Sequence, residues 1–167
     1  GDSNVAVGYL ALDANTTASY ITAVGEKALS ANTTGAKNTA LGRATLQAIT
    51  TQSNNTAVGY NALSGGSNTA ADNTAVGMDA LTATTTGANN VAVGAAALTT
   101  NTTGADNVAV GKDALKDATT ASYNTALGAL ASENNTTGHS NVAVGRASLN
   151  TNSTGDYNVA IGTGSLI

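Results

Sequence analysis

The sequence predicts an all-β fold, a parallel β-solenoid (β-roll) of about ten 17-residue coils. Three observations predict it: a short motif recurs along the whole chain, its spacing is nearly constant, and each copy fits one strand followed by a turn. Asn107 to Gly111 reads Asn-Val-Ala-Val-Gly, and Leu115 follows four residues after the glycine. The spacing is 17 residues at every step except from Gly59 to Gly77, where it is 18. The ten motif glycines are Gly8, Gly25, Gly42, Gly59, Gly77, Gly94, Gly111, Gly128, Gly145 and Gly162.

The strand of each unit is the segment before the glycine, which is small or β-branched and too short for a stable helix. Alternation along a strand puts the residue two before the glycine on one face and its neighbours on the other. That residue is always alanine, and the residue directly before the glycine is always Val, Leu or Ile. Because both faces are apolar, we expect both to be buried. The alanines are Ala6, Ala23, Ala40, Ala57, Ala75, Ala92, Ala109, Ala126, Ala143 and Ala160.

The glycine is predicted to end the strand with a backbone angle or a close approach that a Cβ atom would forbid. A second short strand is expected at the Ala-Leu pair, as in Ala114-Leu115, followed by an Asn-Thr-Thr-Gly turn, as in 101–104. Asparagine begins nine of the ten units, with Ile21 as the exception, so stacked coils should align these amides into a ladder. The structural repeat is represented by Ala6, Gly8, Ala57, Gly59, Leu63, Ala109, Gly111, Leu115, Ala143, Gly145 and Leu149.

The whole chain is predicted to be one repeat domain, 1–167, with coils starting near residues 4, 21, 38, 55, 73, 90, 107, 124, 141 and 158. The extra residue belongs in the connection from Ser64 to Asp72, because a slip inside a strand would flip its faces. In the eighth coil Ser132 replaces the leucine and Leu130 lies two residues early, so we expect a local shift or a weak core there. The tenth coil is incomplete and neither end resembles a polar cap, which favours a fragment of a longer fibre or an end-to-end assembly.

Composition excludes several classes of protein. The chain is 41% apolar and only 10% charged, which argues against disorder. It has no cysteine for a disulfide or thiolate site, and its net charge of −4 comes without a basic cluster for nucleic acid. No apolar run reaches the ~18 residues of a membrane span. The first residues do not have the pattern of a signal segment, so we expect a cytoplasmic protein, a mature fragment or a virion protein.

Burial of the apolar side chains of one coil contributes less free energy than is lost in conformational entropy when the coil becomes ordered. Hydrogen bonds between coils narrow that deficit, but the second apolar face of the strand still needs a cover. The simplest cover is another copy of the chain. We therefore expect a homo-oligomeric rod.

The motif Asn-x-Ala-Val/Ile-Gly-x-x-Ala-Leu, as in 55–63 and 73–81, resembles the head repeats of trimeric autotransporter adhesins and related repeats of bacteriophage tail fibres. The resemblance covers essentially the whole chain. It implies a left-handed β-roll, a trimer, and a location that is extracellular, on a cell surface or in a virion. The Asn-Thr-Thr-Gly turn makes this repeat longer than that of the adhesin heads.

Neither catalytic nor cofactor-binding nor metal-ligating residues are predicted. The only histidine, His139, lies in a turn without a second histidine or a carboxylate cluster at metal-site spacing. Acidic residues are scattered singly, and Asp72, Asp106 and Asp113 fall in turns. The paired glycines and recurring aspartate of calcium-binding β-roll nonapeptides are absent.

Several surface slots recur between coils. Glu26 and Arg43 occupy the position after the glycine in successive coils and could form an ion pair. Tyrosines share two slots, where they could stack on a sugar ring or, more simply, pack over turns. They are Tyr20, Tyr123 and Tyr157 in one slot and Tyr9 and Tyr60 in the other. Glycosylation acceptor patterns begin at Asn15, Asn32, Asn101, Asn135 and Asn152, as expected from turn composition alone.

These observations favour a non-enzymatic structural or adhesive fibre module, an adhesin head or a tail-fibre segment that mediates attachment to a receptor or glycan. The variable turns would carry any receptor contact. The alternative is an ice- or crystal-surface-binding solenoid, which thermal hysteresis would test. Its threonine column would be the first strand residue, but valine interrupts that column at Val5, Val91, Val108, Val142 and Val159. An enzyme is the weakest hypothesis, because no nucleophile and base pair is visible.

Overall fold

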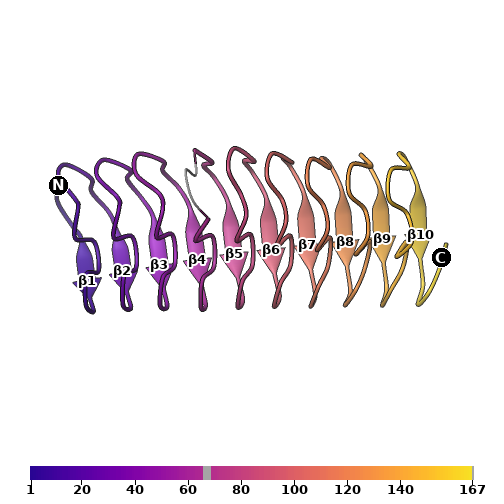
Figure 1. Cartoon of the computed structure of the whole chain (residues 1–167), viewed down its shortest axis with the longest axis horizontal. Coiled ribbons are helices and arrows are strands. Elements are labelled where there is room, and N and C mark those ends of the chain that lie inside the picture. The colour runs from indigo at the N-terminus through magenta and orange to yellow at the C-terminus, as the bar shows by residue number, and fades with distance from the viewer. Residues whose placement is uncertain (66–68, 167) are drawn as a thin grey trace.

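The computed structural model describes residues 1–65 and 69–166 and confirms the parallel β-solenoid. Ten strands lie side by side in chain order in one parallel sheet, and the two termini lie at opposite ends of the rod (Figure 1). Nine turns of the solenoid join them, and the described residues contain no helix. The strands are β1 Val5–Val7, β2 Thr22–Val24, β3 Thr39–Leu41, β4 Thr56–Val58, β5 Thr74–Val76, β6 Val91–Val93, β7 Val108–Val110, β8 Thr125–Leu127, β9 Val142–Val144 and β10 Val159–Ile161.

The register of the sheet aligns equivalent positions of successive coils. Ala109 of β7, for example, lies opposite Ala92 of β6 and Ala126 of β8. Thr56 and Thr74 are partners although the step between them is one residue longer, so the strands keep their register as predicted. The connection predicted to hold the extra residue includes 66–68, which lie outside the described residues.

The alanine face of the sheet forms one wall of the core. From β2 to β10 the central alanine is at most 3% exposed, whereas Ala6 at the end of the rod is exposed. Leu63, Leu115 and Leu149 fill the core opposite the sheet and are buried. The prediction that both strand faces are buried is wrong for the single chain: Val7 is 57% and Val110 38% exposed. The coil encloses only the alanine side, and the other side stays open among the residues that the structure describes.

The predicted second strand at the Ala-Leu pair is also wrong. Asp113 and Leu115 have φ angles of 56° and 49°, in the left-handed region, and the same two positions repeat this conformation in the other coils. Alternating left-handed residues turn the chain sharply, which a strand cannot do. The segment still stacks on its neighbours, because the Leu115 N–H donates to the Ala131 carbonyl at 3.0 Å.

Both reasons proposed for the motif glycine are confirmed. Gly111 has φ of 137°, and a Cβ atom there would lie 2.5 Å from the carbonyl carbon and oxygen of Gly128. Gly8, Gly59 and Gly145 show the same φ region, at 130°, 132° and 126°. The glycine therefore permits both the turn and the close stacking of coils.

The amide ladder is confirmed. The backbone N–H of Asn107 donates to Asn90 Oδ1 at 3.0 Å, and Asn107 Nδ2 donates to the Ala121 carbonyl at 2.8 Å. Ile21 is the break in the ladder: its N–H donates to Asn4 Oδ1, but its side chain offers no acceptor to the next coil. All the inner asparagines of the ladder are buried.

The eighth coil contains a weak core and no shift. Ser132 takes the leucine position with φ of 51°, and its N–H donates to the Ser148 carbonyl at 2.8 Å. Its hydroxyl oxygen is buried and has no hydrogen-bond partner among the described residues. The coil therefore keeps its path but loses apolar packing.

Candidate functional site

The outer face of the sheet is the largest candidate for an interaction surface. We define it as the first and third residues of each strand, which point away from the alanine core. The ten strands contain only valine, threonine, alanine, leucine and isoleucine, so this face carries no charge. Nine spacings of ~4.8 Å between the ten strands extend it over about 43 Å along the rod.

The third-residue column of this face is the more exposed of its two columns. Leu41 is 47% exposed, and Val93, Val110 and Leu127 in the middle of the rod are between 36% and 38% exposed. Monomeric proteins rarely leave such a continuous apolar surface open. The face therefore fits association better than solvation.

The first-residue column mixes threonine with valine. Thr22, Thr39, Thr56 and Thr74 are half-buried and form one run, and valine occupies most of the remaining strands. The hydroxyl groups of this column do not form an unbroken array. The structure thus gives no support for this column as the predicted ice-binding surface.

The post-glycine column, on the turn that follows each strand, contains the predicted ion pair. Arg43 Nε lies 3.3 Å from Glu26 Oε2, and Arg43 also donates to the Tyr60 hydroxyl at 3.2 Å. The guanidinium carbon lies 5.4 Å from the centre of the Tyr60 ring, within cation–π range. These exposed contacts tie three coils together on one edge of the outer face and contribute little stability.

Two further charged pairs lie in the seventh and eighth coils. Lys112 donates a hydrogen bond to Asp113, and this bond together with the aspartate charge raises the pKa of Lys112. Lys116 lies 3.7 Å from Glu133 on the neighbouring turn. The aspartate is buried, so it belongs to a structural contact and leaves no free carboxylate for chemistry.

All five tyrosines are exposed, including Tyr60 beside Arg43. Tyr20 and Tyr123 are each 64% exposed, Tyr157 is 81% exposed and Tyr9 is 71% exposed. Their rings are accessible to a partner, but they lie in separate coils. They add scattered contact points at the two edges of the outer face.

Stacking brings Ser122, His139 and Asp156 together in one column of turns. His139 Nδ1 accepts from the backbone N–H of Ser122 at 3.0 Å, and Asp156 Oδ1 accepts from the backbone N–H of His139. The Ser122 hydroxyl instead faces the Thr120 carbonyl at 3.4 Å. The three side chains therefore link coils, and the serine has no base within hydrogen-bond reach.

Three of the glycosylation acceptor asparagines lie inside the coil. Asn32, Asn101 and Asn135 are fully buried, so their side chains are inaccessible in the folded chain. They have a structural task that the sequence analysis missed. Gly104 O accepts from both Asn101 Nδ2 and Asn90 Nδ2, each at 2.9 Å, so two amides clamp one turn. The sequence feature that could have revealed this role is the fixed spacing of the Asn-x-x-Gly turn relative to the ladder asparagine.

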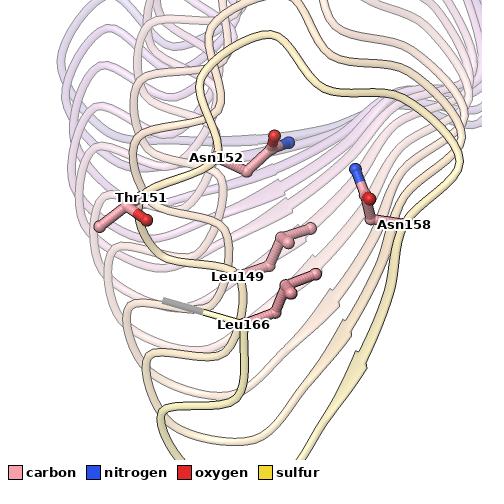
Figure 2. A pocket seen from close by; sticks show the side chains of 5 residues that line it. All are labelled: Leu149, Thr151, Asn152, Asn158 and Leu166. Carbon is pink, nitrogen blue, oxygen red and sulfur yellow. The ribbon is translucent and has the colours of Figure 1, made fainter.

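The described residues hold no group of three or more His, Cys, Asp and Glu side chains that could bind a metal ion. Asp72 and Asp106 are exposed, and each accepts a hydrogen bond from an asparagine of the preceding coil. A cavity of about 250 Å³ opens at the C-terminal end of the rod, as Figure 2 shows. Leu149 and Leu166 stack along one side of it, while Asn152 and Asn158 approach from the other. Between inner coils the next coil occupies this space, so the cavity is an open end of the core.

Comparison with known proteins finds no matching family model, no matching curated protein and no matching solved structure. Among the described residues no helix is long and apolar enough to cross a membrane. Function is therefore argued from geometry, in which the uncharged outer face is the dominant feature.

Proposed function

We propose that this chain is a non-enzymatic structural segment of an adhesive fibre, extracellular or part of a virion, that assembles with further copies of itself through the outer face of its sheet. The observation that carries the proposal is a ten-strand face with no charged residue and exposed aliphatic side chains along its length. A second copy has the same coil rise, so its side chains can stay in step along the rod. A partner without that repeat would lose register within a few coils.

The fibre role is supported by the large share of residues that take part in stacking one coil on the next. Almost every buried side chain repeats a scaffold position, and the described hydrogen bonds of Ser122, His139 and Asp156 serve coil stacking. The resemblance to adhesin and tail-fibre repeats favours three copies. Exposed turns and tyrosines at the edges of the outer face remain free for a receptor or glycan, and several copies would bind it with avidity.

Sedimentation equilibrium of the full chain tests the assembly. We expect an oligomer in wild type and a monomer when Val93→Lys and Val110→Lys are combined, because two buried charges per copy would oppose association. Thr86→Lys with Thr103→Lys is the matched control, since it adds the same charge on exposed turns. A wild-type monomer at high concentration, or a lysine variant that still assembles, contradicts the proposed interface.

Attachment is tested with the same proteins. Fluorescently labelled wild type should adhere to a panel of bacterial and animal cell surfaces, and the monomeric lysine variant should adhere much more weakly because avidity is lost. Assembly without adhesion to any surface would retain the structural role and remove the adhesive one.

A further inference from the structure

The side of the solenoid formed by the Asn-Thr-Thr-Gly turns carries a second regular surface, which we call the threonine face. Each of its nine rungs begins with threonine or serine, and the residues that follow are small except for Gln52, His139 and Asp156. The second position of the turn is threonine in every rung. These residues, here called the outer column, are Thr17, Thr34, Thr51, Thr69, Thr86, Thr103, Thr120, Thr137 and Thr154. Thr69 belongs to it by register, because the carbonyl of the next residue, Ala70, accepts from Asn55 Nδ2 at 3.3 Å as that of Gly87 accepts from Asn73 Nδ2 at 3.0 Å.

Folding explains the threonine before the outer column. The hydroxyl of Thr85 donates to the Thr102 carbonyl in the next coil at 2.9 Å, and that of Thr102 donates to the Thr119 carbonyl at 3.0 Å. The same bond recurs from Thr16, Thr33, Thr119 and Thr136. These side chains are therefore fixed in one orientation, and they hold the turns at a constant spacing.

Folding does not explain the outer column. Its members are exposed, and the hydroxyls of Thr86, Thr103 and Thr120 make no hydrogen bond with any described residue. Two members differ: the Thr69 hydroxyl donates to the Thr85 carbonyl at 3.2 Å, and that of Thr51 accepts from Gln52 Nε2 at 3.0 Å. An exposed turn position without a structural bond is free to vary. The post-glycine position, which is exposed in most coils, varies between Tyr, Glu, Arg, Met, Ala, Lys and Thr, whereas the outer column is threonine in nine rungs out of nine.

The threonine face is also almost free of charge. The chain has 16 charged residues, 6 basic and 10 acidic, yet among the nine rungs only Asp156 is charged. The rungs are 16–19, 33–36, 50–53, 69–71, 85–88, 102–105, 119–122, 136–139 and 153–156. Charged groups would hold water in their own hydration shells. Methyl and hydroxyl groups on a rigid backbone leave water free to adopt a lattice.

We propose that the threonine face binds ice. Its hydroxyls recur at the coil rise of ~4.8 Å, which is close to the short repeat of oxygen positions in the ice lattice. The anchored threonines beside them make the array rigid before contact, so little entropy is lost on binding. Because turns form this surface and strands form the outer face, ice binding is independent of assembly, and an assembled rod would carry several such faces.

Thermal hysteresis and inhibition of ice recrystallisation, measured on the full chain, test the proposal. We expect hysteresis that rises with protein concentration, and its loss when Thr86→Lys, Thr103→Lys and Thr120→Lys are combined. The matched control is Met78→Lys, Ala95→Lys and Ala129→Lys, which adds three charges to the post-glycine column and should retain hysteresis. Circular dichroism melting checks that each variant is folded, and Thr103→Lys alone, with partial loss expected, replaces a triple variant that is not.

Absence of hysteresis in the folded wild type overturns the proposal, whether or not the turns bind a soluble glycan. Equal hysteresis in wild type and the folded threonine variant overturns it as well. Loss in both triple variants would place the activity outside the threonine face and would count against it in the same way.

Discussion

The side-chain oxygen of Asn90 accepts a hydrogen bond from the backbone N–H of Asn107, which lies one coil further along, at 3.0 Å. The bond repeats from Asn107 to Asn124 at 3.0 Å and from Asn124 to Asn141 at 2.9 Å. Each buried amide thus satisfies the backbone of the next coil. This contact sets the register between coils from the inside, where a slipped pairing would leave buried donors unpaired.

Replacement of a ladder asparagine should be strongly destabilising. In Asn107→Ala the N–H of Asn124 and the carbonyl of Ala121 lose their buried partners, and each unsatisfied group costs about 1–3 kcal/mol. We expect a loss of about 2–5 kcal/mol in the free energy of unfolding, measured by urea denaturation at fixed protein concentration.

An exposed asparagine provides the control for the ladder. Asn89 donates to Asp106 on the surface at 3.2 Å, and its left-handed φ of 58° suits asparagine better than alanine, so Asn89→Ala should lower the free energy of unfolding by only about 1 kcal/mol. Similar losses in the Asn89 and Asn107 variants would contradict a special role for the buried ladder.

Substitution of two motif glycines, Gly111 and Gly162, distinguishes the cost of a steric clash from the cost of backbone strain. A Cβ atom at Gly111 would lie 2.5 Å from the Gly128 backbone, whereas one at Gly162 would meet no atom of residues 1–65 and 69–166 nearer than the Ser165 Cβ atom at 4.0 Å. Both have positive φ, at 137° and 120°. Gly162→Ala should therefore cost about 1–3 kcal/mol through strain alone. Gly111→Ala should cost more than about 4 kcal/mol or prevent folding.

Thermal melting of both glycine variants at one protein concentration makes this comparison. Equal shifts of the melting temperature would show that strain dominates and that the coils can move apart to accept a methyl group. A larger shift for Gly111→Ala would show that close stacking of the coils is what requires glycine.

The fold could be predicted from the repeat because the same pattern of residues occurs ten times in the sequence. The alanine position, the glycine and the asparagine ladder each follow from periodicity and the size of one residue. The path after the glycine could not be predicted, because Leu115 occupies a left-handed conformation that leucine rarely adopts, and only stacking on the next coil stabilises it. The open outer face was mistaken for a buried one because alternation shows which side chains are apolar and not what covers them.

The surfaces were predicted less well than the core. The Glu26–Arg43 pair followed from two residues in the same slot of successive coils. Asn101 was expected on the surface of a turn. Its side chain instead points inward and donates to the Gly104 carbonyl, and this orientation depends on the path of the turn, which the sequence does not show. Exposure of Tyr157 likewise depends on the absence of any neighbouring element, which a single strand motif does not reveal.

Ser132 marks a position where stability can be increased. Its hydroxyl is buried without a partner, and the equivalent residues in the neighbouring coils are Leu115 and Leu149. Ser132→Leu should raise the free energy of unfolding by about 1–3 kcal/mol, because it buries a leucine and removes the unpaired group. The reverse change, Leu115→Ser, should lower it by about 2–5 kcal/mol. A destabilised Ser132→Leu protein in urea denaturation would show that the eighth coil has repacked around the serine.

Serine side chains in some turns accept hydrogen bonds from the backbone of the neighbouring coil, and adding one more such serine should increase stability. Ser122 Oγ accepts from the Ala105 N–H at 3.0 Å, and Ser53 Oγ accepts from the Ala36 N–H at the same distance. The N–H of Ala88 faces Ala105 instead and makes no hydrogen bond with a described residue. Ala105→Ser should supply the missing acceptor.

The expected gain from Ala105→Ser is about 0.5–1.5 kcal/mol in the free energy of unfolding, the usual net value of one hydrogen bond. Ser122→Ala is the reverse test, since it removes the equivalent bond one coil further along, and it should lower the free energy of unfolding by a similar amount. Hydrogen exchange of the Ala88 and Ala105 amides, followed by NMR, assigns each change to its own N–H group. Slower exchange at Ala88 in the first variant and faster exchange at Ala105 in the second are the expected results. An unchanged rate at Ala88 would mean that the new hydroxyl prefers water to the neighbouring coil.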